Sequence, residues 1–212
     1  MMPVQRPPCP TFLEEHWQEW GEEYAAKRSN NPAYVFHWKS WQGEPVNRHL
    51  LEPLSHMTDT HCAYCDWFPT DCGTDRTIDH FKSKTDYPLE AYHWPNLYLA
   101  CRQCQQKAVR RLSEAEIGML LRPDAADYTF ERFFIYKYLT GEIEPNPSAD
   151  ATDSLRAKKT IEIFRLNAEG RPIARKRMLA QYSKLDPNSR KSLRQDQPFR
   201  FLLPVEEDST IL

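Results

Sequence analysis

Two Cys-x-x-Cys pairs constrain this chain more than any other feature of its sequence. Cys62 and Cys65 form the first pair, and Cys101 and Cys104 form the second, with thirty-five residues between the pairs. Each pair places two thiolates on one tight turn, from which both can reach a metal ion at about 2.3 Å, so that two pairs complete a tetrahedron. Because four cysteine ligands leave no open position for water, we expect a structural zinc ion here.

Composition limits the compartment and the partners of this chain of 212 residues. Its net charge of −2 does not attract the chain to nucleic acid, so any surface that binds nucleic acid must be a local basic patch. No apolar run approaches the roughly 18–20 residues of a membrane span, and the first residues lack the apolar core of a signal peptide. We therefore expect a cytoplasmic protein with no membrane contact. In a reducing compartment paired cysteines hold metal more often than they form disulfides, and we expect Cys9 and Cys72 to be free thiols, with Cys72 as an alternative ligand.

The segment between the cysteine pairs predicts a small mixed structure. Arg76 to Phe81 is typical of a short strand and carries the Asp79-His80 dyad. A polar loop follows, then a second strand from Asn96 to Ala100 that delivers the second cysteine pair. A helix is expected from Arg102 to Leu112. The predicted order is therefore strand, loop, strand, helix.

The flanking segments predict a helix-rich α+β protein. Thr11 with Glu14 fits a capping box at the start of a helix with an apolar stripe, and a further helix is expected from about Asn47. Aromatic residues over 128–138 predict strands that close at a turn at 140–141. A helical hairpin is expected over 153–185, and the apolar tail residues near Phe199 are expected to dock. The predicted segments are an N-terminal helical segment over 1–58, a metal-binding core over 59–122, C-terminal strands and hairpin over 123–185, and a tail over 186–212.

The central pattern, Cys-x-x-Cys, Ile-Asp-His-Phe-x-x-Lys, Trp-x-Asn-Leu-x-Leu-x-Cys-x-x-Cys, resembles that of the HNH endonucleases, whose core is the ββα-metal fold. The resemblance is nearest to the PtuB-type nuclease subunits of Septu and retron-associated anti-phage systems. It extends to the lead RPPCPTFL and to the segments LLRPDAADYTFERFF, TGEIEPNP and TIEIFRLNAEGRP. The core pattern is specific for the fold, whereas the looser flanking likeness alone carries the assignment to antiviral defence.

The resemblance implies a role for each residue of the pattern. His80 would be the general base, Asp79 a ligand of a catalytic Mg²⁺ or Mn²⁺, and Asn96 the residue that fixes the loop and orients the His80 ring. HNH proteins commonly have Asn or His directly after the second cysteine pair, and this chain has Gln105, whose carbonyl can still bind a hard cation. His93 is the second choice for a catalytic imidazole.

Basic residues near this core are the expected contacts to nucleic acid, with DNA favoured over RNA. The positive charge missing from the whole chain is concentrated over 154–200, where a basic surface could hold a phosphate backbone without reading sequence; a solvated helix face or an acidic protein partner explains it equally well. The candidate contacts are Lys82, Lys84, Lys107, Arg110, Arg175 and Lys176.

Three functions stay open from the sequence. The first is an HNH nuclease gated by an ATPase subunit of the PtuA kind, in some systems together with a retron reverse transcriptase; this chain has no nucleotide-binding motif of its own. The second is a zinc-clamped nucleic-acid-binding or adaptor module whose active site has lapsed at Gln105. The third is a nuclease of restriction or repair that works without an ATPase.

Overall fold

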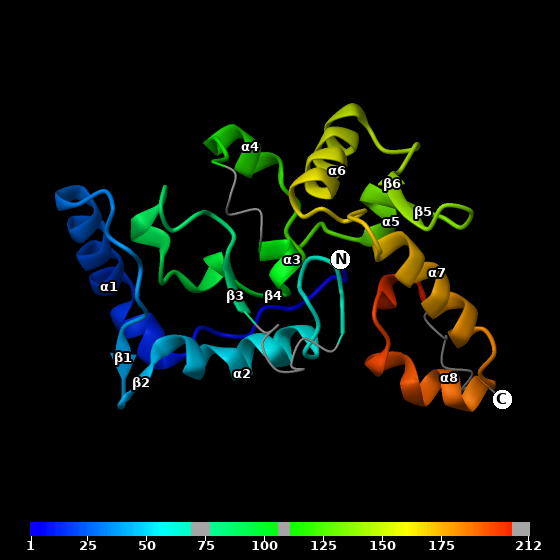
Figure 1. Ribbon diagram of the computed structural model, residues 1–212, viewed down its shortest axis with the longest axis horizontal. Coiled ribbons are helices and arrows are strands. Elements are labelled where there is room, and N and C mark those ends of the chain that lie inside the picture. Colours follow the sequence, from blue (N-terminus) through cyan, green and yellow to red (C-terminus); the bar gives the residue numbers. More distant parts are fainter. Residues whose placement is uncertain (69–76, 106–110, 205–212) are drawn as a thin grey trace.

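The computed structural model of this chain describes residues 1–68, 77–105 and 111–204. Helices dominate, and the strands are short, so the chain is a helix-rich α+β protein. Figure 1 shows helix α1 at one end of the molecule and helices α7 and α8 at the other. The helices are α1 Thr11–Asn30, α2 Val46–Thr58, α3 Arg102–Gln105, α4 Glu114–Met119, α5 Phe130–Phe133, α6 Ala151–Ile163, α7 Arg171–Tyr182 and α8 Pro187–Leu193.

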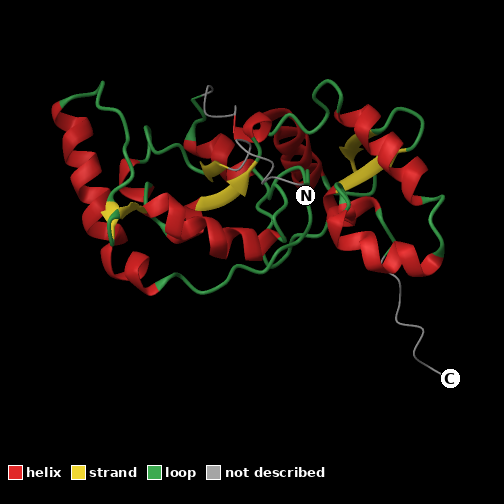
Figure 2. Ribbon diagram, turned by 60° about the horizontal axis from the view of Figure 1, so that its bottom comes forward, coloured by secondary structure: helices red, strands yellow, loops and turns green. Residues whose placement is uncertain are grey.

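The strands form three separate antiparallel pairs within the described residues, as Figure 2 shows. β1 with β2 and β5 with β6 are hairpins, whereas β3 and β4 are joined by a long loop that contains the 3₁₀ turns η1 Pro88–Glu90 and η2 Trp94–Asn96. In the central pair Asp79 lies opposite Tyr98 and His80 opposite Leu97. The strands are β1 Ser40–Trp41, β2 Glu44–Pro45, β3 Thr77–His80, β4 Leu97–Ala100, β5 Phe134–Lys137 and β6 Glu142–Pro145.

The predicted order of strand, loop, strand and helix is confirmed as β3, loop, β4 and α3. Every residue of β4 is buried, and helix α2 packs against it. The described residues of α3 end at Gln105, and Leu112 lies outside any helix, so the predicted helix end at Leu112 is wrong. β3 and β4 thus place the dyad between the N-terminal helices and the second cysteine pair.

Helix α1 packs through the predicted stripe, but its predicted cap is wrong. Leu13, Trp20 and Tyr24 are buried, while the opposite face is exposed. The residue before the helix is Pro10, and no side chain caps the first turn, so Thr11 is the first helical residue instead of the cap. Proline's fixed φ and missing N–H suit a helix start without a polar cap.

The C-terminal half contains a short helix that the sequence did not predict. Phe130 and Phe133 belong to α5, because Thr129 caps that helix by accepting a hydrogen bond from the backbone N–H of Arg132. The strand begins only at Phe134, and the hairpin turns near Gly141, as predicted. The two predicted helices are confirmed as α6 and α7, but α6 packs mainly on β6, α4 and α5 and does not form a close hairpin with α7.

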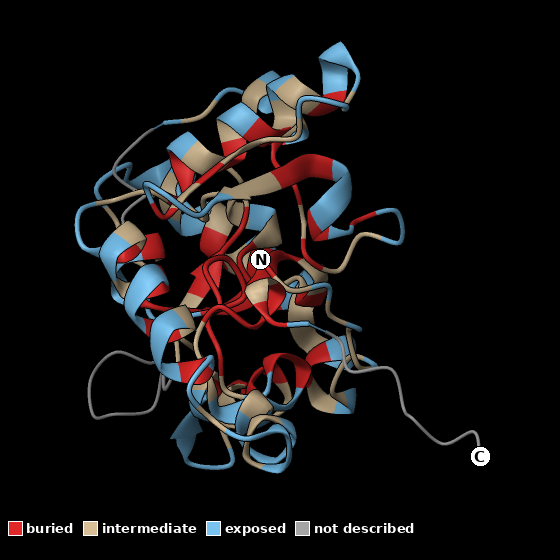
Figure 3. Ribbon diagram, turned by 90° about the vertical axis from the view of Figure 1, so that its right-hand side faces the viewer, coloured by how far each residue is buried: buried red, intermediate tan, exposed pale blue. Residues whose placement is uncertain are grey.

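Both ends of the described chain are docked. Phe199, Phe201 and Leu203 of the tail are buried on this chain, so the predicted docking of the tail needs no partner subunit at these residues. Met1 is also fully buried, and Figure 3 shows the N-terminus among buried segments. Burial lowers the pKa of its amino group to about 5. The two ends therefore contribute to the interior.

The N-terminal lead is fastened by an ion pair at Asp124. The Nε of Arg6 lies 2.7 Å from Oδ2 of Asp124, and the hydroxyl of Tyr98 donates to Oδ1 at 2.5 Å. Arg6 also stacks on the Tyr98 ring, 4.4 Å from its centre, and donates to the carbonyl of Leu97 in β4. The lead thus supports the strand that ends at the second cysteine pair.

No described helix combines the length and the apolar composition that crossing a membrane requires.

The Asp124 pair gives a prediction about stability and pH. Burial acts to raise the pKa of Asp124, but the hydrogen bonds from Tyr98 and Arg6 and the nearby arginines lower it overall. A lowered folded-state pKa stabilises the fold above the unfolded-state pKa of about 3.9, and this stability is lost as pH falls through the folded-state value. Asp124→Asn should lower the free energy of unfolding at pH 7 by about 3 kcal/mol.

Urea denaturation at pH 7 and at pH 3 measures this effect. The difference between Asp124→Asn and the wild type should shrink at pH 3. Asp127→Asn is the matched control, because Asp127 pairs with Arg132 at an exposed site, where ion pairs stabilise little. An equal loss in the two variants would contradict the prediction.

Candidate functional site: a four-cysteine cluster beside the Asp79-His80 strand

The four cysteines of the two pairs come together in the interior. Cys62, Cys65, Cys101 and Cys104 are buried, and their sulfur atoms all lie within 4.8 Å of one another. The first pair lies on the turn after α2; in the second pair, Cys101 directly follows β4 and Cys104 belongs to α3. The backbone N–H of Ala63 donates to the carbonyl of Leu99, which joins the first turn to β4. The cluster that the spacing predicted is therefore confirmed as a group that could hold a metal ion.

The sulfur geometry fits a tetrahedral metal site. With metal–sulfur bonds of about 2.3 Å, a tetrahedron has sulfur atoms about 3.8 Å apart. The Sγ atoms of Cys65 and Cys101 are 3.7 Å apart. Four soft thiolate donors suit zinc better than a hard cation. Zinc is therefore the metal that fits this donor set.

Helix α7 contributes two buried arginines next to this cluster. Arg171 donates through Nη2 to the sulfur of Cys104 at 3.1 Å and to that of Cys101 at 3.7 Å. Burial acts to lower the pKa of Arg171, but the facing thiolates raise it overall. Arg175 is fully buried and donates to the backbone carbonyls of Gly141 and Leu166. The expectation that Arg175 contacts nucleic acid does not fit this position, because its guanidinium points inward.

The tail fastens the first cysteine turn from the other side. Arg200 is buried, and its Nη2 lies 2.9 Å from Oδ1 of Asp66, the residue after Cys65. Its Nη1 donates to Asp59 at 2.7 Å, and the backbone N–H of Phe199 donates to the carbonyl of Asp66. Burial raises the pKa of Asp66, although Arg200 acts in the opposite direction. The cluster is thus enclosed by residues distant in sequence.

Asp79 lies on β3 and is almost fully buried. Its Oδ2 accepts a hydrogen bond from the hydroxyl of Tyr64 at 2.7 Å. Tyr64 lies between Cys62 and Cys65, so the first cysteine turn holds the carboxylate directly. Burial raises the pKa of Tyr64 well above its usual value, so its hydroxyl remains a donor.

His80 follows Asp79 on the strand, and consecutive strand residues point to opposite faces. Its Nε2 lies 2.9 Å from the carbonyl oxygen of Ala91. Trp38 stacks on the imidazole with ring centres 5.4 Å apart, and Phe36 meets it edge-on at 5.5 Å. Only 6 % of the His80 surface is exposed. Burial, and secondly the charge of Lys84, lower its pKa to about 3.

Asn96 holds the loop between the two strands, which is the position that the resemblance implied. Its Oδ1 accepts from the backbone N–H of Lys82 at 2.7 Å, and its Nδ2 donates to the carbonyls of Lys82 and Glu90. Because Ala91 follows Glu90, Asn96 fixes the carbonyl that receives the His80 ring. Its influence on the ring runs through this backbone.

Gln105 lies beside β3, at the last described residue of α3. Its Nε2 donates to the backbone carbonyl of Ile78 at 3.1 Å. This hydrogen bond involves only the amide nitrogen. The side-chain oxygen, which is the atom that could bind a cation, takes no part in it. Gln105 and Asp79 therefore offer two oxygen donors next to the same strand.

The candidate phosphate contacts have different surroundings. Lys82 donates to Oε1 of Glu90 at 2.5 Å, whereas Lys84 lies over the Phe36 ring. Lys176 is exposed and donates to the carbonyl of Leu139. Lys107, Arg110 and Cys72 lie outside the described residues. His93 contacts Trp17, with ring centres 4.5 Å apart, and lies 3.6 Å from Glu90.

Sequence reasoning missed Tyr64, the aromatic cover of His80, and the two α7 arginines. The arginines had a signal: Arg171, Arg175, Met178 and Tyr182 are spaced 4, 3 and 4, which is the spacing of one buried helix face. The aromatic cover had none, because residues 31–39 form no helix or strand.

Metal content gives the next prediction. The purified protein should contain about one zinc ion per chain, and Cys62→Ser should lose it and unfold, because structural zinc supplies folding energy. Metal analysis and circular dichroism measure the two effects. Cys9→Ser is the control, since Cys9 lies outside the cluster and burial raises its thiol pKa to about 11. A folded, zinc-free Cys62→Ser protein would contradict a structural zinc site.

Arg171 gives a prediction about metal retention. Arg171→Met removes the donor to two ligand sulfurs, and residues that hydrogen-bond metal ligands typically change affinity by about 10- to 100-fold. Competition with a chromogenic chelator should therefore show tighter zinc binding in the wild type by at least about tenfold. Arg177→Met on the exposed side of α7 is the matched control and should behave as the wild type. Equal zinc affinity in all three proteins would refute this role of Arg171.

Comparison of the chain with protein-family models finds no matching family, and a search of curated proteins finds no similar sequence.

Proposed function

We propose that this chain is a metal-dependent endonuclease of the HNH type that hydrolyses phosphodiester bonds, with DNA favoured over RNA. The observation that carries the proposal is the position of His80. Its ring is oriented by a backbone carbonyl, on a strand that pairs with β4 next to the four-cysteine cluster. Asp79 and Gln105 supply oxygen donors beside the same strand.

The hydrogen bond to Ala91 selects one tautomer of His80. A carbonyl oxygen can only accept, so Nε2 must carry the hydrogen, and Nδ1 keeps its lone pair. A pKa of about 3 keeps the ring neutral at pH 7, and it also makes the buried ring a weak base, because a general base works best with a pKa near the operating pH. No hydrogen bond joins Nδ1 to another described residue in the structure, so its lone pair can take a proton from water.

Oxygen donors of this kind suit a hard cation. The carboxylate of Asp79 and the side-chain carbonyl of Gln105 are the residues that would hold Mg²⁺ or Mn²⁺. A cation bound there would stabilise charge on the phosphoryl and leaving oxygens. Tyr64 holds one oxygen of the Asp79 carboxylate at 2.7 Å and so fixes its orientation.

In the proposed chemical step, His80 accepts one proton from water. The oxygen of water bonds to phosphorus, and its proton passes to Nδ1 of His80. The bond from phosphorus to the 3′ oxygen breaks, and the proton then reaches that leaving oxygen. Asn96 acts through the backbone that it holds, so it is a positioning residue.

A second candidate function is a zinc-clamped nucleic-acid-binding or adaptor module. Three observations favour it: Gln105 occupies the position of the usual ligand and uses its amide on Ile78, His80 is 6 % exposed, and Asp79 and His80 point to opposite faces of β3. Such a module would keep the metal cluster and bind partners without cutting.

The biological setting that we propose is anti-phage defence of the Septu kind, with the chain as the nuclease partner of a PtuA-type ATPase. The flanking sequence resemblance supports this setting. Any ATP dependence would come from the partner subunit. Restriction or repair without an ATPase is the alternative, which the genomic neighbours would distinguish.

Cleavage of plasmid DNA and total tRNA with Mg²⁺ or Mn²⁺ tests the proposed activity. His80→Ala should reduce cleavage by at least about 10²-fold, because a general base contributes that much or more. His80→Gln, which fills more of the site, is the second variant if alanine disturbs the fold. Zinc content and thermal unfolding show that each variant is intact.

The proteins should be compared alone and co-expressed with their encoded neighbours. Cleavage only in the presence of the neighbours would show that a partner activates the site. Undiminished cleavage by a folded His80→Ala protein would refute the catalytic assignment. A folded, zinc-loaded wild type that never cuts would favour the binding module.

A further inference from the structure

Two lysines follow His80 closely, and their electrostatic surroundings differ. The ammonium of Lys82 lies 2.5 Å from Oε1 of Glu90, so a carboxylate already neutralises it. Lys84 forms no ion pair with any described residue. Its Nζ lies 5.4 Å from the centre of the Phe36 ring instead. The two lysines are thus only two residues apart, but Lys82 is paired with a carboxylate and Lys84 is not paired with any described carboxylate.

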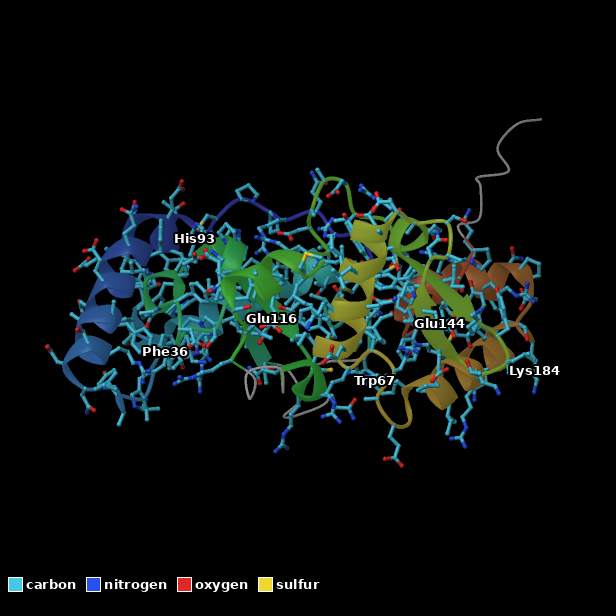
Figure 4. All side chains as sticks on the ribbon, turned by 90° about the horizontal axis from the view of Figure 1, so that it is seen from above. Phe36, Trp67, His93, Glu116, Glu144 and Lys184 are labelled. Carbon is cyan, nitrogen blue, oxygen red and sulfur yellow. The ribbon has the colours of Figure 1, made fainter. Side chains whose placement is uncertain are left out.

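Phe36 places the ammonium of Lys84 on the His80 side of the molecule. The Phe36 ring is 5.4 Å from Nζ of Lys84 and 5.5 Å from the centre of the His80 ring, so one aromatic side chain contacts both. Figure 4 shows Phe36 towards the α1 end, far from Lys184 at the opposite end. The cation and the imidazole are therefore neighbours of the same aromatic ring.

Partial burial makes an unpaired ammonium costly. Burial lowers the pKa of Lys84 from its usual value, and the charge of Lys84 in turn helps to lower the pKa of His80. Buried charges in proteins are normally paired, because removal from water is expensive. The contact with an aromatic ring offsets only part of that cost. A cation kept in this state is suited to an anion that arrives from outside.

We propose that Lys84, and not Lys82, binds the phosphodiester group that His80 acts on. This inference rests on the proposed nuclease function and assigns one residue to the substrate. The ammonium would donate to a non-bridging phosphoryl oxygen and so hold phosphorus near Nδ1 of His80. Lys82 remains with Glu90 and supports the loop.

Matched substitutions separate the two lysines. Lys84→Gln and Lys82→Gln remove the same charge from positions two residues apart, and Lys84→Arg keeps the charge. With plasmid DNA and Mn²⁺, Lys84→Gln should lower kcat by at least about tenfold, because a lost donor to transition-state charge typically costs more than that. Lys82→Gln should stay within about threefold of the wild type, and Lys84→Arg should recover part of the loss.

Binding without cleavage supplies an independent measurement. In the His80→Ala background, with a short DNA duplex and Ca²⁺, fluorescence anisotropy gives the dissociation constant as a function of salt. Loss of one phosphate contact should reduce the slope of log K against log salt by about one. This reduction should appear in Lys84→Gln and be absent in Lys82→Gln.

Thermal unfolding of the free proteins tests the electrostatic premise without substrate. Lys84→Gln removes an unpaired, partly buried cation and should leave Tm unchanged or raise it. Lys82→Gln breaks the contact with Glu90 and should lower Tm. A lower Tm for Lys84→Gln than for Lys82→Gln would overturn the inference.

The outcomes distinguish this inference from the proposed function. If the wild type cuts and His80→Ala does not, while Lys84→Gln cuts like the wild type, the nuclease stands and the Lys84 assignment fails. An equal loss in the two Gln variants also refutes the assignment. If the folded, zinc-loaded wild type neither cuts nor binds nucleic acid, the proposed function fails and the assignment falls with it.

Discussion

Charge balance around the four cysteines is the constraint on which much of this structure depends. Four thiolates around one bound divalent cation would carry a net charge of about −2, and an uncompensated charge in the interior is very costly. Helix α7 supplies two cations, because Arg171 and Arg175 are both buried and Arg171 donates to two of the sulfurs. The four-cysteine cluster and helix α7 are therefore parts of one electrostatic unit. This explains why two arginines lie inside a helix that looked like a basic surface.

The first cysteine turn is also the point where distant segments meet. It holds Asp79 through Tyr64, and the tail holds the same turn through Arg200 and Asp66. Arg6 reaches β4 from the N-terminal lead. Since β3 pairs with β4, the position of the dyad depends on contacts made by both ends of the chain. Segments from both ends of the chain therefore help to hold the candidate site in position.

Sequence reasoning worked where short spacing decides the structure, and failed where partners are distant. Two tight cysteine turns, the two short strands β3 and β4, and the helical spacing of Leu13, Trp20 and Tyr24 are local, and the structure confirms them. The burial of Arg175 depends on carbonyls of Gly141 and Leu166, which no local pattern reveals. Asn96 was recognised through its place in a pattern, and its real partners are backbone atoms. The catalytic roles themselves remain predictions, because burial and hydrogen bonds establish position and not chemistry.

The aromatic cover of His80 has a consequence for how such a protein could stay harmless in a cell. Phe36 and Trp38 lie on a segment without helix or strand, which the hydroxyl of Tyr92 joins through the backbone of His37 and Lys39. Opening this segment would break both hydrogen bonds at Tyr92 and the packing of Phe36 and Trp38 on that ring. A cost of about 3 kcal/mol would leave fewer than about 1 % of molecules open at any moment. In the proposed nuclease, activity at rest would scale with this open fraction, and a partner that binds the open form would raise that fraction without changing any of the proposed catalytic groups.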